Sequence, residues 1–326
     1  MASLVERFPV TAEEFDGPVL VTCAGGCIGS WALAILVRAG VPVVAFDLSA
    51  DTRRPRLLMS EEDLGQVAWV TGDIAETAAV RRAVDEHGIR AILHLAALQV
   101  PFCKAEPVGG AKVNVVGTVN VFEAARDAGI RRLAYASSIA AHSMAPGSPW
   151  LPTLYGAYKA CNEMTARVYH HDWGVPSVGF RPGVVYGVGR DQGMSSKTTV
   201  AILAAAAGRP YTTPFRGPVS GLHAGEAASA FIRAVASERD DAPVFDLNGV
   251  PTTVERWLAI LHDIAPEARL EAGGAPLPFP ADLSDEPVRA YLGDYGSIPL
   301  EDGIRATYGA FKALLADGRM SAESVA

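Results

Sequence analysis

The feature that most constrains the fold of this chain is an alternation of short apolar runs with longer segments of helical spacing, beginning near residue 18. Short runs rich in β-branched residues are typical of buried parallel strands, and the helical segments between them have the character of crossover connections. We therefore expect six strands, at residues 19–22, 41–46, 67–71, 91–94, 132–136 and 177–181. Helices are expected around residues 31–38, 77–87, 111–128 and 155–173. This pattern predicts an α/β fold with a doubly wound parallel sheet, the Rossmann arrangement, whose ligand crevice lies beyond the carboxyl ends of the strands.

The regularity weakens after about residue 183, where proline and glycine become frequent, as in Gly217-Pro218 and between residues 273 and 280. Residues 1–182 are expected to form the dinucleotide-binding Rossmann domain. Residues 183–326 are expected to form mainly a smaller substrate-binding region, with some segments returning to the Rossmann core. Within that region, the alanine-rich run at residues 201–207 predicts a tightly packed helix.

Charge and composition argue against several classes of function. The net charge of −8 disfavours a nucleic-acid partner, because nucleic-acid binders concentrate positive charge on one face. No apolar run reaches the roughly 18 residues of a membrane span, and the charged first 17 residues lack the pattern of a signal peptide, so a cytoplasmic protein is expected. Cys23, Cys27, Cys103 and Cys161 lack the spacing of a zinc site, so we expect buried thiols and no metal.

A glycine cluster separates the first expected strand from the first expected helix. Gly25, Gly26 and Gly29 lie in this segment. Glycines there permit a tight turn and let backbone N–H groups approach a pyrophosphate at the positive end of the helix. Because glycines are common in such turns, the cluster alone is weak evidence for a dinucleotide.

Asp47 strengthens this interpretation, because it ends the second expected strand about twenty residues further on, where a carboxylate accepts hydrogen bonds from the adenosine ribose. A carboxylate also repels a 2′-phosphate, so NAD is favoured over NADP. Arg53 and Arg54 follow shortly afterwards and leave NADP open as the alternative.

These features resemble the extended short-chain dehydrogenases/reductases, the NAD-dependent epimerase/dehydratase family, which includes sugar-nucleotide epimerases, dehydratases and sugar-acid dehydrogenases. The family pattern at this loop is Gly-x-x-Gly-x-x-Gly. Here Gly26 and Gly29 stand at the second and third positions, and Cys23 stands at the first. The resemblance covers about residues 18–250 and implies an NAD-dependent enzyme with a Rossmann fold.

The resemblance also implies a set of cofactor-binding residues. Residues 72–74 resemble the segment that meets the adenine ring, and residues 94–97 resemble the strand end that passes beneath the cofactor. Residues 180–190 resemble the strand and loop that close over nicotinamide, with backbone groups of Val184 and Val185 near its carboxamide. The cofactor-binding residues expected are Gly26, Cys27, Ile28, Gly29, Asp47, Asp73, Ile74, Leu95, Ala96, Ala97, Tyr155, Lys159, Pro182, Val184 and Val185.

Tyr155 and Lys159 are four residues apart, so on a helix both side chains lie on one face. A phenol normally titrates near pH ~10, and a nearby ammonium lowers its pKa, giving a base that can deprotonate a substrate alcohol. Tyr158 is adjacent to Lys159 and points to a different face, so Tyr155 is preferred. The resemblance implies that Lys159 also binds the nicotinamide ribose and that Asn114 supports the active site.

Two serines follow the fifth expected strand, Ser137 and Ser138. A hydroxyl at the carboxyl end of a strand can donate to the substrate oxygen and stabilise developing charge. The family pattern places Ser138 in the catalytic position, four residues before His142, and leaves Ser137 as the alternative. The catalytic set expected is Ser138, Tyr155, Lys159 and Asn114.

Sugar-nucleotide enzymes of the family commonly carry an asparagine shortly after the arginine of the sixth strand. Pro182, Gly183 and Val184 stand there instead, which favours a smaller substrate without a nucleotide. The fork of Arg190 suits a carboxylate, although an ion pair with Asp191 or another acid is an equal alternative. The substrate-binding residues expected are Gln99, Ser138, Ser143 and Arg190.

The preferred hypothesis is an oxidoreductase, an NAD-dependent dehydrogenase that oxidises a secondary alcohol of a small polar substrate such as a sugar, sugar acid or hydroxy acid. The alternative is a nucleotide-sugar epimerase or dehydratase that recycles NAD internally. A non-catalytic nucleotide-binding protein is the second alternative, and Cys23 is the one feature that encourages it.

The family resemblance further implies a homodimer that forms through the helices around residues 111–128 and 155–173. Val115, Val119 and Phe122 have a suitable helical spacing for that interface. The same stripe could instead pack against the core of its own chain.

Overall fold

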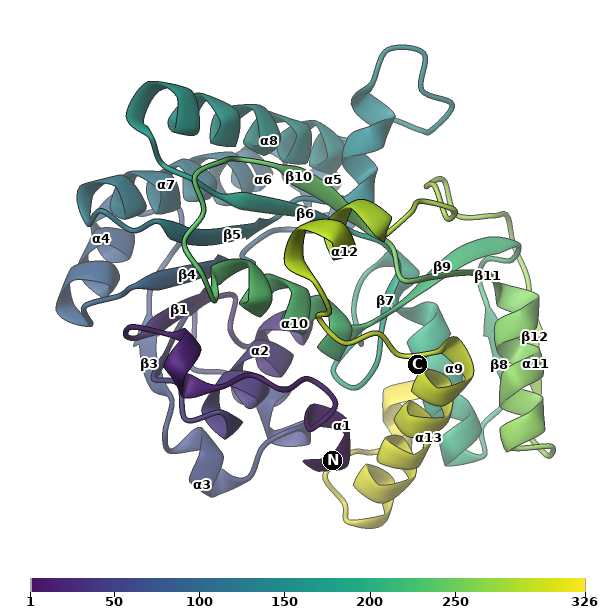
Figure 1. Ribbon diagram of the computed structural model, residues 1–326. Coiled ribbons are helices and arrows are strands. Elements are labelled where there is room, and N and C mark those ends of the chain that lie inside the picture. Colours follow the sequence, from purple (N-terminus) through teal and green to yellow (C-terminus); the bar gives the residue numbers. More distant parts are fainter. Residues whose placement is uncertain (1, 326) are drawn as a thin grey trace.

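The computed structural model describes residues 2–325 and contains a seven-stranded, entirely parallel sheet with the strand order β10-β6-β5-β4-β1-β2-β3 (Figure 1). The strands are β1 (Val19–Thr22), β2 (Val43–Asp47), β3 (Ala68–Thr71), β4 (Ala91–His94), β5 (Arg132–Ala136), β6 (Val178–Pro182) and β10 (Val244–Leu247). The predicted doubly wound α/β fold is therefore confirmed. Three of the six expected strands have the predicted bounds, and β2 starts later because Pro42 has no N–H for the ladder.

Helices cover both faces of this sheet, and alternate residues of each strand point to opposite faces. Val19 and Val21 of β1 join one core cluster with α2 (Cys27–Arg38) and α10 (Ala224–Val235). Leu20 joins the other cluster with α4 (Thr77–Glu86), α7 (Gly117–Asp127) and α8 (Leu154–Trp173). In Figure 1, α7 and α8 lie above the sheet and α2 and α10 lie below it.

The sheet receives contributions from late in the chain. Strand β10 pairs with β6, and α10 packs beside α2. Sequence periodicity missed β10, because its four residues include Asp246 and follow a loop-rich stretch. Both elements come from beyond residue 183.

The remaining late elements form a smaller layer beside the carboxyl ends of the main strands (Figure 1). A three-stranded sheet consists of β7 (Val185–Tyr186), β9 (Pro218–His223) and β11 (Val250–Thr253). A separate pair consists of β8 (Tyr211–Thr213) and β12 (Leu270–Ala272). The helices of this layer are α9 (Lys197–Ala207), α11 (Val254–Ile264) and α13 (Leu300–Ala316). Helix α9 contains the predicted alanine-rich helix.

Several short helices connect these elements: α1 (Ala2–Val5), α3 (Glu61–Leu64), α5 (Val100–Ala105), α6 (Pro107–Ala111) and α12 (Glu286–Leu292). The single helix expected at residues 111–128 is interrupted by a π-helical turn at Lys112–Val116, which contains Asn114. Within residues 2–325, no helix is long and apolar enough to cross a membrane.

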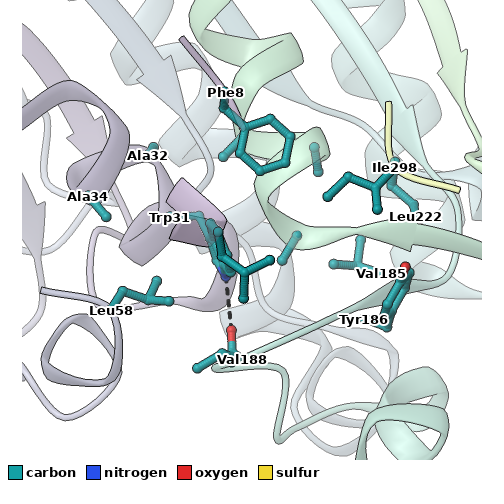
Figure 2. Close-up of a cluster of buried hydrophobic side chains, with 14 of the residues drawn as sticks. Phe8, Trp31, Ala32, Ala34, Leu58, Val185, Tyr186, Val188, Leu222 and Ile298 are labelled. Carbon is teal, nitrogen blue, oxygen red and sulfur yellow. Dashed lines mark hydrogen bonds between the residues drawn. The ribbon is translucent and has the colours of Figure 1, made fainter. Parts of the chain in front are cut away.

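Trp31 joins the two layers. Its buried indole lies on α2 and makes edge contacts with Phe8 and His223, and its Nε1 donates to the carbonyl of Val188 at 3.0 Å (Figure 2). Val188 follows β7, at the start of the loop that lies over the site described below. Helix α2 therefore holds the start of a loop from the later layer.

Candidate active site

A cavity of about 390 Å³ lies at the carboxyl ends of the main strands, between the two layers. It brings together most of the residues that the sequence singled out. Those that line it are Gly26, Cys27, Ile28, Gly29, Leu95, Ala97, Gln99, Ser138, Tyr155, Lys159, Pro182, Val184, Val185 and Arg190.

Six expected site residues do not line this cavity. Asp47 ends β2, and its two carboxylate oxygens accept from the N–H groups of Gly25 and Leu48. Asp73 accepts from the N–H of Ala75, and Ile74 is buried in the core. The other three, Ala96, Asn114 and Ser143, have polar groups that bond within the protein.

The loop between β1 and α2 has the geometry of an anion site. Gly26 is the N-terminal cap of α2, and the first turn of that helix carries no acidic residue. A Cβ on Gly29 would press on the carbonyl of Cys23 and lie 2.9 Å from Cα of Ala24, so only glycine fits there. The cavity wall therefore presents the positive end of a helix, and this fits the diphosphate of a dinucleotide.

Cys23 takes the left-handed backbone conformation, with φ of 54°, and is the one non-glycine residue with positive φ in the described part of the chain. The cysteine thus adopts the conformation for which the family uses its first glycine. Burial raises the pKa of the Cys23 thiol to about 12 and that of Cys27 to about 11. Both thiols are therefore neutral, and neither adds negative charge to the anion site.

A buried polar chain fixes the end of β4. His94 lies between the hydroxyls of Thr22 and Thr118, at 3.0 and 3.1 Å. Burial lowers the pKa of His94 to about 3, so the ring is neutral. The Thr22 hydroxyl also accepts from the N–H groups of Leu95 and Ala96. These bonds hold the backbone that the resemblance places beneath the cofactor.

Lys159 is 2% exposed, and its Nζ donates to the carbonyl of Ala136 at 2.6 Å and lies 5.6 Å from the ring centroid of Tyr155. Burial lowers the pKa of Lys159 to about 8. Burial raises the pKa of Tyr155, while the Ser138 hydroxyl and the Arg190 guanidinium act in the opposite direction. Arg190, which the sequence suggested as a substrate ligand or as the partner of an acidic residue, thus also acts on the phenol.

Tyr155 and Ser138 each had a neighbouring alternative in the sequence, Tyr158 and Ser137, and these alternatives lie in different surroundings. The Tyr158 hydroxyl donates to the carbonyl of Pro107 at 2.9 Å, and Tyr158 does not line the cavity. Ser137 donates its hydroxyl proton to Glu163, a carboxylate that also receives two bonds from Arg181. Ser138 accepts from the N–H of Ala140 at 3.2 Å, and its side chain also hydrogen-bonds Tyr155 at the cavity wall.

Asn114 is fully buried behind this group, within the π-helical turn. Its Nδ2 donates to the carbonyls of Gly110 and Leu98, and its backbone carbonyl accepts from Asn162 at 2.8 Å. Asn114 therefore ties the helix to the segment before α5 without touching the cavity.

Arg190 lies in a loop whose glycines at 187, 189 and 193 all have positive φ. Its Nη2 donates to the Ser195 hydroxyl at 3.2 Å. Among residues 4–323, no carboxylate lies within 4.0 Å of this guanidinium, because Asp191 pairs with Arg54 at 2.8 Å instead. The alternative of an ion pair between Arg190 and Asp191 is therefore wrong.

Other details were not foreseen. The Val184 N–H donates to the Ser220 hydroxyl, and its carbonyl accepts from Leu222, so both groups are engaged within the protein. Sequence reasoning missed that Arg54, Asp191, Met194, Ser195 and Phe279 line the cavity. A second cavity, of about 640 Å³, adjoins the first and shares Arg54 and residues 189–192 with it.

Residues 19–246 match the protein family described as the NAD dependent epimerase/dehydratase family. The chain belongs to this family. Membership confirms the resemblance identified from the sequence, the assignment as an NAD-dependent enzyme and NAD as the cofactor.

The curated proteins that resemble this chain carry the names of epimerases and of dehydrogenases. The UDP-glucose 4-epimerase of Klebsiella pneumoniae is 32% identical over 136 residues, 41% of this chain and 97% of the relative. The NAD-dependent glucose-6-phosphate dehydrogenase of Haloferax volcanii is 33% identical over 189 residues, 50% of this chain and 67% of the relative. The UDP-glucuronate 4-epimerase 6 of Arabidopsis thaliana is 31% identical over 182 residues, and the match spans 52% of this chain but only 40% of that enzyme.

Solved structures resemble this chain over nearly its whole length. The UDP-glucose 4-epimerase of Thermus thermophilus in complex with NAD is 26% identical, with a TM-score of 0.73 and coverage of 90% of this chain and 99% of that chain. A partial consensus L-threonine 3-dehydrogenase shares the fold, with 24% identity, a TM-score of 0.76 and coverage of 91% and 99%.

Proposed function

We propose that this family member is a dehydrogenase that oxidises a secondary alcohol of a small acid, such as a sugar acid or hydroxy acid, with NAD as the oxidant. The observation that carries the proposal is the Arg190 guanidinium, which lines the same cavity as Ser138 and Tyr155 and has no acidic partner among residues 4–323. A partly buried guanidinium without a carboxylate partner favours a ligand that brings one.

In the proposed reaction, the substrate hydroxyl lies between Ser138 and Tyr155, and its carboxylate pairs with Arg190. Ser138 donates a hydrogen bond to the substrate oxygen, and Tyr155, as phenolate, takes the hydroxyl proton. The carbon–hydrogen bond breaks as the carbon–oxygen double bond forms, and NAD, when bound along the start of α2, supplies the acceptor for the hydride. Lys159 lies 5.6 Å from the centroid of the Tyr155 ring, and we expect its ammonium to favour the anionic form of the phenol.

Crowding around Gly183 supports a substrate without a nucleotide. A Cβ at this position would lie 2.5 Å from the Ser220 hydroxyl and 2.9 Å from Oδ1 of Asn248. The segment after β6 therefore has little room for the polar side chain that sugar-nucleotide enzymes commonly carry there. Residues 183–326 supply the opposite wall of the cavity, and we propose that they act mainly as the substrate-binding region.

The alternative is an epimerase or dehydratase that returns the hydride to its product, and the names of several relatives favour it. It uses the same Ser138, Tyr155 and Lys159. A nucleotide-binding protein without turnover is the second alternative, and the strained Cys23 favours it.

We also propose that the protein forms a homodimer through the outer faces of α7 and α8. Met164 and Val168 are four residues apart on α8, and both are about half exposed, as is Val116 just before α7. Phe122 belongs to the core of its own chain, so it is not available for the dimer interface that the sequence suggested. We expect Met164→Glu to convert a dimer into a monomer in size-exclusion chromatography with light scattering, and elution of the unchanged protein as a monomer would contradict the proposal.

The test of function is absorbance at 340 nm with purified protein, NAD or NADP, and a panel of sugars, sugar acids, polyols and hydroxy acids. We expect NADH formation with acids, its loss in Tyr155→Phe and its retention in Tyr158→Phe. No net NADH from a protein that holds NAD tightly would favour the epimerase. Reversible NAD binding without turnover of acids or nucleotide sugars would favour the non-catalytic protein.

A further inference from the structure

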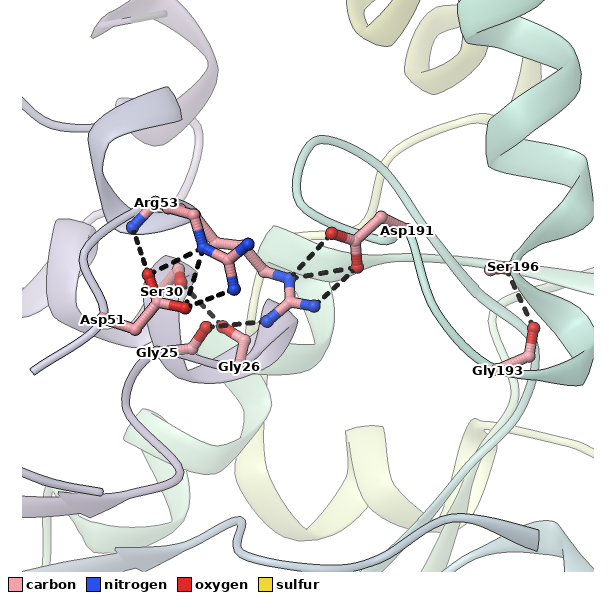
Figure 3. Close-up of polar contacts among 9 residues, drawn as sticks. Gly25, Gly26, Ser30, Asp51, Arg53, Asp191, Gly193 and Ser196 are labelled. Carbon is pink, nitrogen blue, oxygen red and sulfur yellow. Dashed lines mark hydrogen bonds and ion pairs between the residues drawn. The ribbon is translucent and has the colours of Figure 1, made fainter. Parts of the chain in front are cut away.

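Arg54 connects the cofactor loop with the loop that carries Arg190. Its Nη1 donates to the carbonyl of Gly25 at 3.1 Å, while Nε and Nη2 donate to Asp191 at 3.0 and 2.8 Å. Figure 3 shows this bridge between Gly25 and Asp191. The two ends of the ion pair are 137 residues apart in the sequence.

The guanidinium of Arg54 lies at the anion site rather than on open surface. The Arg54 side chain is 19% exposed, and Gly25 directly precedes the N-terminal cap of α2. Its positive charge acts to lower the pKa of both loop thiols, Cys23 and Cys27, against the larger effect of their burial. Arg54 and the start of α2 therefore present positive charge to the same wall of the cavity.

Arg54 has hydrogen-bonding capacity to spare. A guanidinium carries five N–H groups, and the bonds to Gly25 and Asp191 engage three of its nitrogens, so one N–H on each of Nη1 and Nη2 stays free. Two N–H groups on one planar guanidinium match the spacing of phosphate oxygens.

Asp191 and Arg190 are consecutive but lie in different environments. Arg190 approaches Ser195 within the reaction cavity, and Asp191 extends to Arg54. The start of their loop is held at Val188 by Trp31 of α2. A change in the position of Arg190 therefore acts directly, through one peptide unit, on the partner of Arg54.

We infer that Arg54 is a further cofactor-binding residue that contacts the diphosphate of NAD, and that Asp191 is a positioning residue that holds Arg54 in place. The inference rests on the proposed function for the presence of NAD at this site. Arg53 serves no such role, because its side chain is 85% exposed and its guanidinium pairs with Asp51. The ion pair between Arg54 and Asp191 thus links cofactor binding to the position of the loop that carries Arg190.

The test compares Arg54→Met with its matched control Arg53→Met by calorimetric titration of the cofactor-free protein. The probes are NAD and ADP-ribose, which contain a diphosphate, and adenosine, which does not. We expect Arg54→Met to weaken NAD and ADP-ribose by the same factor, roughly 10- to 100-fold, and to leave adenosine unchanged. Arg54→Lys should recover part of the loss, and Arg53→Met should bind all three probes like the unchanged protein.

Asp191→Asn tests the positioning role. It keeps the shape of the side chain and removes its charge, so we expect a smaller loss of NAD affinity and no further loss when it is combined with Arg54→Met. Full additivity of the two substitutions would overturn the positioning role.

Equal affinity of Arg54→Met and the unchanged protein for NAD would overturn the role of Arg54 in cofactor binding and leave the proposed function standing. A loss that extends equally to adenosine would also overturn it, because Arg54 would then only maintain the loop. Failure of the unchanged protein to bind NAD would refute both the proposed function and the role of Arg54 in cofactor binding.

Discussion

The two walls of the reaction cavity are built in different ways. The cofactor wall consists of strand ends and one helix start, held by glycines that admit no side chain and by the Thr22–His94–Thr118 chain. The substrate wall consists of a loop with three glycines at positive φ and a contribution from the distant Phe279. The contrast teaches that the fold itself supplies the cofactor site, while substrate choice depends on loops that can change without altering the sheet.

The largest expected effect comes from removing the hydroxyl of Tyr155, the proposed base. Tyr155→Phe should lower kcat by about 10³-fold, within the range for loss of a general base, while the affinity for NAD changes little. Steady-state kinetics and NAD titration check this together. Tyr158→Phe, which loses only the bond to Pro107, should keep full activity, and an equal loss in both variants would point to damage of α8 instead.

Arg190→Gln should weaken substrate binding without affecting cofactor binding. We expect KM for an acid substrate to rise about 10- to 100-fold, because a charge-assisted pair contributes about 1.5–3 kcal/mol, and we expect the Kd for NAD to stay the same. Arg190→Lys should recover part of the loss. An unchanged KM would refute the carboxylate assignment and return the substrate class to neutral sugars.

The same substitution sharpens the comparison through pH. Arg190 lowers the pKa of Tyr155, so its removal raises that pKa, and the phenolate then forms only at higher pH. The acid limb of the kcat profile for alcohol oxidation should therefore move to higher pH in Arg190→Gln. A limb that stays in place would show that Arg190 does not influence the titration of Tyr155.

Cys23→Gly should have the smallest effect and tests the cofactor wall. Glycine relieves the left-handed strain but enlarges the entropy of the unfolded chain, so the free energy of unfolding should change by less than about 1 kcal/mol. NAD affinity should persist or improve. Chemical denaturation and calorimetry measure both quantities, and a tenfold loss of NAD affinity would mean that the thiol itself contributes to binding.

The sequence predicted the cofactor wall far better than the substrate wall. Periodicity located β1, β4 and β5, and local spacing then placed Tyr155 and Lys159 on one helix face. The ion pair of Arg54 could not be found in this way, because its partner lies far along the chain and in a loop without periodicity. The homodimer and the boundary near residue 183 stay predictions.

The depth at which Lys159 lies also has a thermochemical consequence. Its pKa of about 8 lies close to neutral pH, so the fraction of Lys159 that carries a proton responds to a change in its surroundings. A ligand that changes the hydration or charge around this nitrogen must therefore exchange a fraction of a proton with the medium. The heat of cofactor binding will then depend on the ionisation enthalpy of the buffer, and that dependence reports on a side chain that no solvent probe reaches.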